Sequence, residues 1–202
     1  MSTPLRYARH LPLTGFGAEG QRRLATTRVL LVGLGGLGCP VATYLTSAGV
    51  AELLLNDFDT VDESNLARQF LYGVEDIGRP KVEVAAARLH AMNQAVRQTM
   101  IAERLAGEAL ASAVGEADVV VDASDNFATR FAVNAACVAT RTPLVSGAAI
   151  RYEGQLAVGA VMKLVAGLPV HSGTLSLYDA ITEEWRRIRL RKRPACPACH
   201  SP

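Results

Sequence analysis

A glycine-rich turn, Val32-Gly-Leu-Gly-Gly-Leu-Gly38, joins a short apolar run to a segment of small and apolar residues. The run over residues 28–32 has the length and composition of a buried parallel strand, and residues 39–48 are expected to form the helix that follows. A turn of this kind brings the backbone close to a phosphate, which the helix N-terminus also attracts. The cradle that we expect is made of Gly33, Gly35, Gly36 and Gly38.

The rest of the chain continues the alternation of strand and helix. Further parallel strands are expected over residues 52–56, 96–101, 118–122 and 143–146, and helices over 17–24, 81–93, 107–114 and 127–140. Antiparallel strands are expected in the tail, over residues 155–158, 174–178 and 185–190. This pattern predicts an α/β fold: a Rossmann-like, doubly wound, mainly parallel sheet with antiparallel C-terminal strands. We expect residues 1–202 to form one domain.

Composition excludes several classes of protein. Half of the 202 residues are hydrophobic and the net charge is +2, so nothing global indicates disorder or nucleic-acid binding. No apolar run is long enough to span a membrane, and the first residues lack the apolar stretch of a secretory signal, so we expect a cytoplasmic protein. Six basic side chains lie between residues 186 and 193. We interpret them as the solvated face of an edge strand, with a patch for an acidic partner or a nucleic acid as the alternative.

Charged and amide side chains follow the predicted strands where a ligand would bind. Asp57 has the spacing from the glycine turn at which an acidic residue contacts ribose, and it is preferred to Asp59 for this role. Arg68 and Lys81, with Asn65, suit a triphosphate. Arginine presents a fork of donors to phosphate, and lysine is a mobile point charge. Asp125 is suited to Mg²⁺, which is usually held by one or two carboxylates and nucleotide phosphates.

A nicotinamide-dependent oxidoreductase is a rival interpretation, since it would use the same glycine turn and Asp57. It leaves Arg68, Lys81 and Asp125 without a role, and the sequence contains no Tyr-x-x-x-Lys pair. The four histidines form no recognisable catalytic arrangement and are interpreted as surface or structural residues. A non-catalytic nucleotide-binding homologue is a third interpretation.

Seven motifs occur in a fixed order along the chain. They are Arg6-Tyr7-x-Arg9-His10, Val32-Gly-Leu-Gly-Gly-Leu-Gly38, Asp57-Phe-Asp-x-Val61, Ser64-Asn-Leu-x-Arg-Gln69, Arg79-Pro-Lys81, Asp122-x-x-Asp-Asn126 and Ser146-Gly-Ala-Ala-Ile-Arg151. Through them the chain resembles the ubiquitin-activating-like adenylyltransferases. The resemblance is to the bacterial MoeB, ThiF and HesA type, which activates sulfur-carrier proteins in molybdopterin and thiamine synthesis. It covers about residues 6–158, with a similar tail at about 160–200.

The resemblance implies a homodimer that uses ATP and Mg²⁺. The terminal glycine carboxylate of a ubiquitin-like sulfur carrier ending in Gly-Gly would attack the α-phosphate, giving an acyl-adenylate and pyrophosphate. It also implies ribose binding by Asp57 and a magnesium and catalytic role for Asp125, while Arg9 would act from the partner subunit. The phosphate contacts would be Asn65, Arg68 and Lys81, and the motif neighbours Gln69 and Asn126 are counted with the nucleotide-binding set.

Four cysteines are too few for a disulfide scaffold, and Cys39 and Cys137 are expected to be buried. Cys196 and Cys199 form a CxxC pair. It could be half of a zinc site, an idle or redox-active pair, or a c-type haem attachment, which would require export. In the resembling family this pair completes a Cys₄ zinc site with an earlier CxxC, which is absent here. About fifty residues that the family carries are missing between about 158 and 160. Omission of that segment from the sequence is preferred to a true deletion, and Zn²⁺ is expected only if the segment exists.

Overall fold

The structure is a computed structural model that describes the chain except for residues 1–4, 151–152, 155–157, 180, 192–195 and 197–202. A central parallel sheet is formed by β1 (Arg28–Val32), β2 (Glu52–Asn56), β3 (Arg97–Ile101), β4 (Val119–Asp122) and β5 (Leu144–Ser146). Its helices are α1 (Gly17–Leu24), α2 (Gly38–Ala48), α3 (Lys81–Met92), α4 (Gly107–Gly115), α5 (Phe127–Thr140) and α6 (Val158–Ala166). Short 3₁₀ turns are η1 (Leu5–Tyr7), η2 (Glu63–Asn65) and η3 (Val74–Asp76).

The central sheet has the strand order β3-β2-β1-β4-β5, and each neighbouring pair is parallel. The chain runs outward from β1 to β3 and then returns to the other side of β1 with β4. The order therefore reverses between β1 and β4, and loops leave these strands in opposite directions. This topological switch point is where open α/β sheets bind ligands. The expected doubly wound fold is confirmed.

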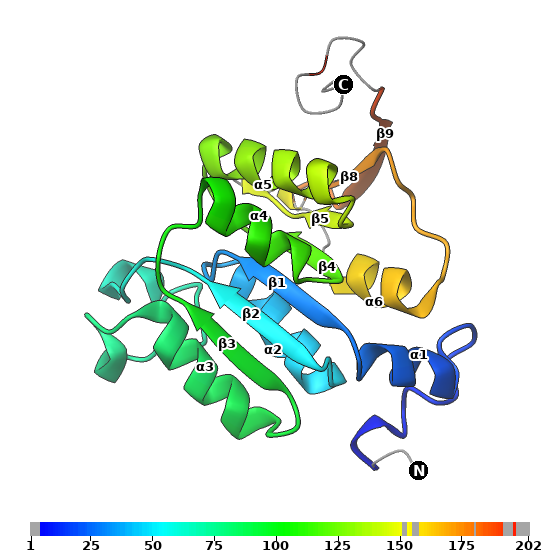
Figure 1. The fold of residues 1–202 in the computed structure, drawn as a ribbon. Helices are drawn as coiled ribbons and strands as arrows, with labels where there is room; N and C mark the ends of the chain where they lie inside the picture. The colour runs from blue at the N-terminus through cyan, green and yellow to red at the C-terminus, as the bar shows by residue number, and fades with distance from the viewer. Residues whose placement is uncertain (1–4, 151–152, 155–157, 180, 192–195, 197–202) are drawn as a thin grey trace.

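Alternating side chains of the buried strands supply two cores. Val29 and Leu31 of β1 join the larger cluster with α2 and α3, to which residues of α1 and α6 also contribute. Leu30 and Val32 face the opposite way and join the smaller cluster with α4 and α5. Figure 1 shows these helices on the two faces of the sheet. Because both faces are covered, the strands are continuous apolar runs.

A second sheet holds the tail in the antiparallel order β6-β7-β8-β9. Its strands are β6 (Ala149–Ile150), β7 (Glu153–Gly154), β8 (Thr174–Asp179) and β9 (Glu184–Arg189). The expected antiparallel strands over 174–178 and 185–190 are confirmed to within a residue. The strand expected over 155–158 is wrong at Val158, which begins α6, and its other residues lie outside the described part. Val161 of α6 is fully buried in the larger core, where α6 packs against α1 and α2.

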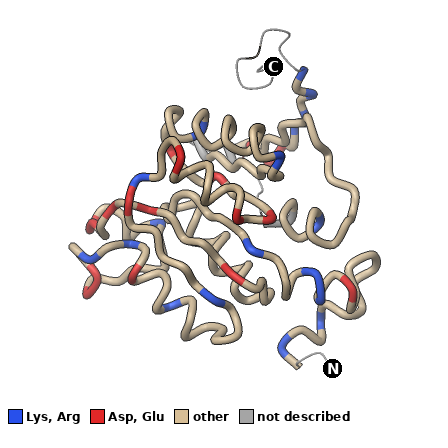
Figure 2. Tube along the Cα trace, in the orientation of Figure 1, with Lys and Arg blue, Asp and Glu red and all other residues tan. Residues whose placement is uncertain are grey.

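The charged residues of both signs are interspersed over most of the trace (Figure 2). The exception is β9, an edge strand whose residues are all exposed and include Arg186, Arg187 and Arg189. This agrees with the interpretation of the basic run as an exposed edge, as far as Arg191; the run's last two residues lie outside the described part.

In the described part of the chain, no helix combines the length and apolar character needed to cross a membrane.

Candidate nucleotide site

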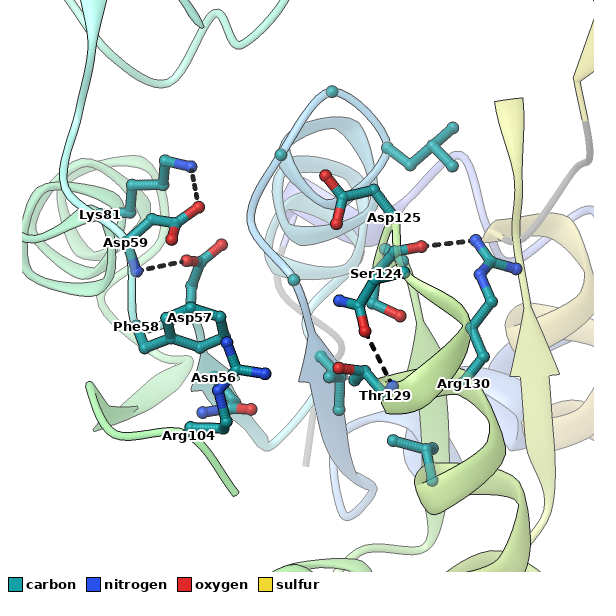
Figure 3. A pocket seen from close by; sticks show the side chains of 18 of the residues that line it. Asn56, Asp57, Phe58, Asp59, Lys81, Arg104, Ser124, Asp125, Thr129 and Arg130 are labelled. Carbon is teal, nitrogen blue, oxygen red and sulfur yellow. Dashed lines mark hydrogen bonds and ion pairs between the residues drawn. The ribbon is translucent and has the colours of Figure 1, made fainter. Parts of the chain in front are cut away.

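A cavity of about 780 Å³ opens where β1, β2 and β4 end. The glycine turn forms its centre, residues after β2 form one wall and residues after β4 form the other (Figure 3). The residues expected to bind nucleotide that line it are Gly33, Gly35, Gly36, Asp57, Asn65, Arg68, Gln69, Lys81, Asp125 and Asn126. Motifs spread over more than ninety positions thus meet in one cavity, as expected from parallel strands whose carboxyl ends share an edge.

The glycines of the turn divide into two kinds. A Cβ atom at Gly33, whose φ is +93°, would lie 2.9 Å from the carbonyl oxygen of Ala123, and one at Gly38 would overlap the carbonyl oxygen of Gly33. These two positions therefore need glycine for backbone packing. Gly35 and Gly36 have no neighbour closer than 3.5 Å to such an atom, and both line the cavity. They leave the room that a phosphate chain needs, whereas Gly38 supports the turn from behind.

Asp57 connects the glycine turn to the end of β2 through a hydrogen bond. Its Oδ2 accepts a hydrogen bond of 2.7 Å from the Leu34 N–H, and its Oδ1 accepts one of 2.9 Å from the Asp59 N–H. Burial raises the pKa of the Asp57 carboxyl, and the two backbone donors and the Lys81 charge act in the opposite direction. Each carboxylate oxygen retains a lone pair for a further donor such as a ribose hydroxyl. Asp57 is thus a structural tie as well as the candidate ribose ligand.

Lys81 and Asp59 form an ion pair on the same wall of the cavity (Figure 3). The Nζ atom of Lys81 donates to Oδ2 of Asp59 at 3.0 Å, and the Lys81 backbone N–H donates to the Asp59 carbonyl oxygen at the same distance. The lysine side chain is 6% exposed, whereas that of Asp59 is 55% exposed. The cation is therefore held at the N-terminus of α3, facing the cavity. The sequence analysis preferred Asp57 to Asp59 as the ribose ligand and did not predict the ion pair between Asp59 and Lys81. Asp59 lies two residues after Asp57 in the loop that follows β2.

Asn65 is the last residue of η2, and Arg68 and Gln69 come from the turn that follows it. The guanidinium of Arg68 donates to the Ser64 carbonyl oxygen at 3.0 Å, and its aliphatic stem lies 3.5 Å from the Cβ position of Gly36. Asp62 is the N-cap of η2, and Asn65 completes the capping box because its Oδ1 accepts from the Asp62 N–H. Gln69 is 3% exposed, and its Oε1 has no hydrogen-bond partner in the described structure. Arg68 has donors left for an anion, and the Asn65 amide supports the loop.

Asp125 projects from the opposite wall, between β4 and α5 (Figure 3). Among the described residues its exposed carboxylate has no hydrogen-bond or ion-pair partner, so it is free for a cation. The neighbouring Asn126 caps α5 by accepting from the Thr129 N–H at 2.9 Å. Arg130 donates to the carbonyl oxygens of Ser124 and Gly147, which ties the Asp125 loop to the loop after β5. Sequence reasoning missed Arg130, whose partners become apparent only in the folded chain.

A second residue pair that the sequence did not reveal lines the lower part of the Asp59 wall in Figure 3. The guanidinium carbon of Arg104 lies 4.1 Å from the centre of the Phe58 ring. Phe58 follows β2 and Arg104 follows β3, so the contact is tertiary. The only sequence signal was the aromatic residue inside the Asp57-Phe-Asp motif.

Other predicted residues lie away from the cavity. Arg9 is exposed and does not line it. Its neighbour Tyr7 contacts Asn93 and Gly49, which precede β3 and β2. This segment therefore packs at the end of the sheet where the strands begin, whereas the cavity lies where they end. Cys39 and Cys137 are buried as expected, and burial raises the pKa of each thiol to about 11.

No histidine lines the described cavity, which agrees with non-catalytic histidines. The described residues contain no cluster of three or more His, Cys, Asp or Glu side chains that could hold a metal ion. Cys196 is half-buried, and Cys199 lies outside the described residues.

Known proteins are similar to this chain over nearly its whole length. The ThiF family matches residues 7–160. The sulfur carrier protein ThiS adenylyltransferase of Escherichia coli K12 is 39% identical over 237 residues, covering 96% of this chain and 94% of that protein. The molybdopterin-synthase adenylyltransferase of the same organism is 39% identical over 238 residues, covering 96% of each. Both aligned stretches exceed the 202 residues of this chain, so these relatives have residues without a counterpart here.

Solved structures support the fold alone, since their sequence identity is low. A crystal structure of E. coli MccB with MccA-N7isoASN has a TM-score of 0.89 at 20% identity, covering all of this chain and 76% of that one. A structure of E. coli MccB with ATP has a TM-score of 0.86 at 20% identity, covering 98% of this chain and 74% of that one. On the match over residues 7–160 and the identity to full-length relatives, the chain belongs to the ThiF family.

Proposed function

We propose that this protein is an ATP-dependent adenylyltransferase that activates the C-terminal glycine of a ubiquitin-like sulfur carrier protein ending in Gly-Gly. The observation that carries the proposal is the meeting of Arg68, Lys81, Asp57 and Asp125 around one glycine turn. Relatives named as sulfur-carrier adenylyltransferases, aligned over nearly their whole length, supply the reaction class. The thiamine-type and molybdopterin-type relatives are equally similar at 39% identity, so the proposal covers either carrier.

The chemistry of the reaction agrees with the side chains present. A terminal carboxylate has a pKa of about 3.3–3.7, so it is ionised at neutral pH and needs no general base. The barrier lies in bringing this anion to a phosphate, in line with the departing pyrophosphate. Arg68 and Lys81 supply positive charge at the cavity, and Asp57 would orient the ribose. A site of cations without a catalytic histidine is what such a reaction requires.

Mg²⁺ fits the residues of the cavity. A magnesium ion that accompanies a nucleotide needs only one or two carboxylates from the protein, and the unpartnered Asp125 carboxylate offers one. When bound, the ion would supply charge neutralisation for the phosphates. Zn²⁺ is proposed only for a chain that has the additional segment near residues 158–160, where Cys196 and Cys199 would be two of its four ligands. A cytoplasmic location accompanies this proposal, since ATP and reduced cysteines are found there.

We also propose a homodimer in which Arg9 completes the partner's site. The support is that Arg9 is exposed, and that its segment packs where the strands begin, away from the cavity of its own chain. Mixing Arg9→Ala protein with Asp125→Ala protein should then restore activity, because a mixed dimer has one intact site. Random exchange of subunits in a two-fold dimer gives about a quarter of wild-type activity. A mixture as inactive as its components would contradict the action of Arg9 from the partner.

The test of the function is ATP–pyrophosphate exchange with purified protein and candidate carriers ending in Gly-Gly. We expect exchange that requires Mg²⁺ and one carrier, and that disappears when the carrier lacks its last glycine. ATP binding without exchange for any carrier would refute adenylation and favour a non-catalytic homologue. Nicotinamide dinucleotide binding without ATP binding would instead favour an oxidoreductase.

A further inference from the structure

The carbonyl oxygen of Leu34, in the middle of the glycine turn, is held from inside the protein by two side-chain donors. The Tyr72 hydroxyl donates to it at 2.9 Å and the Cys39 thiol donates to it at 3.2 Å. All three residues are buried, and none of them lines the cavity. Burial raises the pKa of the phenol and of the thiol, so both stay protonated and remain donors. The two bonds occupy both lone pairs of the carbonyl oxygen.

These two bonds fix the direction of the next N–H group along the chain. The Leu34 carbonyl and the Gly35 N–H belong to one peptide unit, and the described chain contains no cis peptide bond. In a planar trans peptide the two groups point in opposite directions. The Gly35 N–H therefore points away from the buried side of the turn, and Gly35 lines the cavity. This N–H has no acceptor among the described residues, so it is available to a ligand.

The Tyr72 hydroxyl also joins the glycine turn to the loop that carries Arg68. Backbone hydrogen bonds make this loop compact: the Arg68 N–H donates to the Asn65 carbonyl oxygen at 3.1 Å. The Tyr72 N–H donates to the Gln69 carbonyl oxygen at the same distance. Arg68 packs on the turn itself, with its aliphatic stem 3.5 Å from the Cβ position of Gly36. Tyr72 therefore connects two parts of the site that both face the cavity, although its own side chain does not.

We propose that Tyr72 is a positioning residue of the nucleotide site, which directs the Gly35 N–H at a phosphate of ATP and holds the glycine turn against Arg68. Cys39 supports the same carbonyl more weakly, because a thiol is a weak donor. The inference rests on the proposed function for the presence of phosphates in the cavity. Donors that are in place before ATP arrives need no reorganisation when it binds. Loss of the Tyr72 hydroxyl therefore weakens phosphate binding from behind the turn, without removing any group that lines the cavity.

The first test removes only the hydroxyl, in Tyr72→Phe, and measures the binding of ATP and of inorganic tripolyphosphate by calorimetry with Mg²⁺ present. We expect both affinities to fall by about tenfold, the effect of one lost hydrogen bond. Cys39→Ala should lower both by about threefold, and it tests the same carbonyl if Tyr72→Phe does not fold. Tyr44→Phe is the matched control, because Tyr44 is a 62% exposed residue of α2 outside the cavity lining. Urea unfolding shows that the variants compared are folded.

The second test observes the Gly35 N–H directly, in the NMR spectrum of protein labelled at its glycine nitrogens. We expect its proton resonance to move downfield when tripolyphosphate binds, because the N–H then donates to an anion; Gly35→Ala identifies the signal by its loss. At saturating tripolyphosphate the shift should be smaller in Tyr72→Phe and unchanged in Tyr44→Phe. Wild-type affinities in Tyr72→Phe would overturn the inference. Weaker binding with a wild-type Gly35 shift would also overturn it, because the loss would then come from general loosening of the fold.

The same experiments separate this inference from the proposed function. A wild-type protein whose phosphate binding depends on the Tyr72 hydroxyl but which never supports pyrophosphate exchange would refute adenylation and leave the positioning role standing. Carrier-dependent exchange in the wild type, together with unchanged phosphate binding in Tyr72→Phe, would refute the positioning role alone. A wild-type protein that binds neither ATP nor tripolyphosphate would overturn both.

Discussion

Replacing Lys81 by methionine separates the catalytic role of the cavity from the stability of the fold. The lysine side chain is 6% exposed and its Nζ lies 3.0 Å from Asp59, which is 55% exposed. Methionine fills a similar volume, and the Asp59 carboxylate left behind remains solvated. A pair with one such exposed partner contributes at most about 1 kcal/mol. The free energy of unfolding should therefore change by no more than about 1 kcal/mol.

The catalytic cost of the same change should be several times larger. Loss of one preorganised donor at a site of developing charge costs about 10²–10³ in rate, or about 3–4 kcal/mol. Pyrophosphate exchange measures this cost, and urea unfolding of the same preparation measures stability. Lys163→Met is the matched control, since Lys163 is an exposed residue of α6 outside the cavity lining. Full exchange activity in Lys81→Met, or a loss that merely follows unfolding, would refute the reasoning.

Three further predictions concern the site and its support. Arg68→Ala and Asp125→Ala should abolish exchange while leaving the thermal transition intact, because both side chains are exposed in the cavity; near wild-type exchange in either variant would contradict the assignment. Gly38→Ala should destabilise the fold by about 1–3 kcal/mol through its overlap with the Gly33 carbonyl. Gly36→Ala should preserve stability and weaken ATP binding; a Gly38→Ala variant that melts at the same temperature as Gly36→Ala would show the turn to be more adaptable than described. Glu52→Gln should lower stability at neutral pH by about 1–3 kcal/mol and flatten its fall in acid, as measured by urea unfolding at several pH values.

The sign of the Glu52 effect follows from its surroundings at the start of β2. Burial acts to raise the pKa of this carboxyl, but hydrogen bonds from Thr99, Arg97 and Arg28 outweigh it, and the pKa is lowered from 4.5. A lowered pKa in the folded state stabilises the fold at pH values above 4.5, and that stabilisation is lost as pH falls through the folded value. The glutamine variant has no such group to titrate. An unchanged acid limb would show that Glu52 does not control it.

Local sequence patterns were sufficient to predict the strands and helices of the central sheet. The strand Arg28–Val32 has the expected bounds because burial on both faces leaves a continuous apolar run. The helix Phe127–Thr140 also has the expected bounds, although it buries only Val133 and Cys137. The tail was predicted less well. The two-residue strands β6 and β7 carry too few residues to show a period, and Val158 begins a helix because α6 buries Val161 against the core.

In the candidate site, too, features that follow from local sequence were predicted and those that depend on tertiary packing were not. The glycine turn, Asp57, Arg68, Lys81 and Asp125 were predicted because each follows a predicted strand or belongs to a recognisable motif. The pairing of Lys81 with Asp59, the ties of Arg130 and the stacking of Arg104 on Phe58 were not predicted. Each joins side chains from different loops, and their distances are set by the packing of the sheet and not by spacing in the chain.

The central claim is that a carrier's terminal carboxylate attacks the α-phosphate of ATP. The most direct measurement follows the radiolabel from ATP labelled at the α-phosphorus, in parallel with ATP labelled at the γ-phosphorus, in a mixture of this protein, Mg²⁺ and a Gly-Gly carrier. The account predicts that the α label appears on the carrier, that the γ label leaves in pyrophosphate, and that Lys81→Met abolishes both transfers. Carrier labelled from the γ-phosphorus, or ADP formed in place of pyrophosphate, would contradict it.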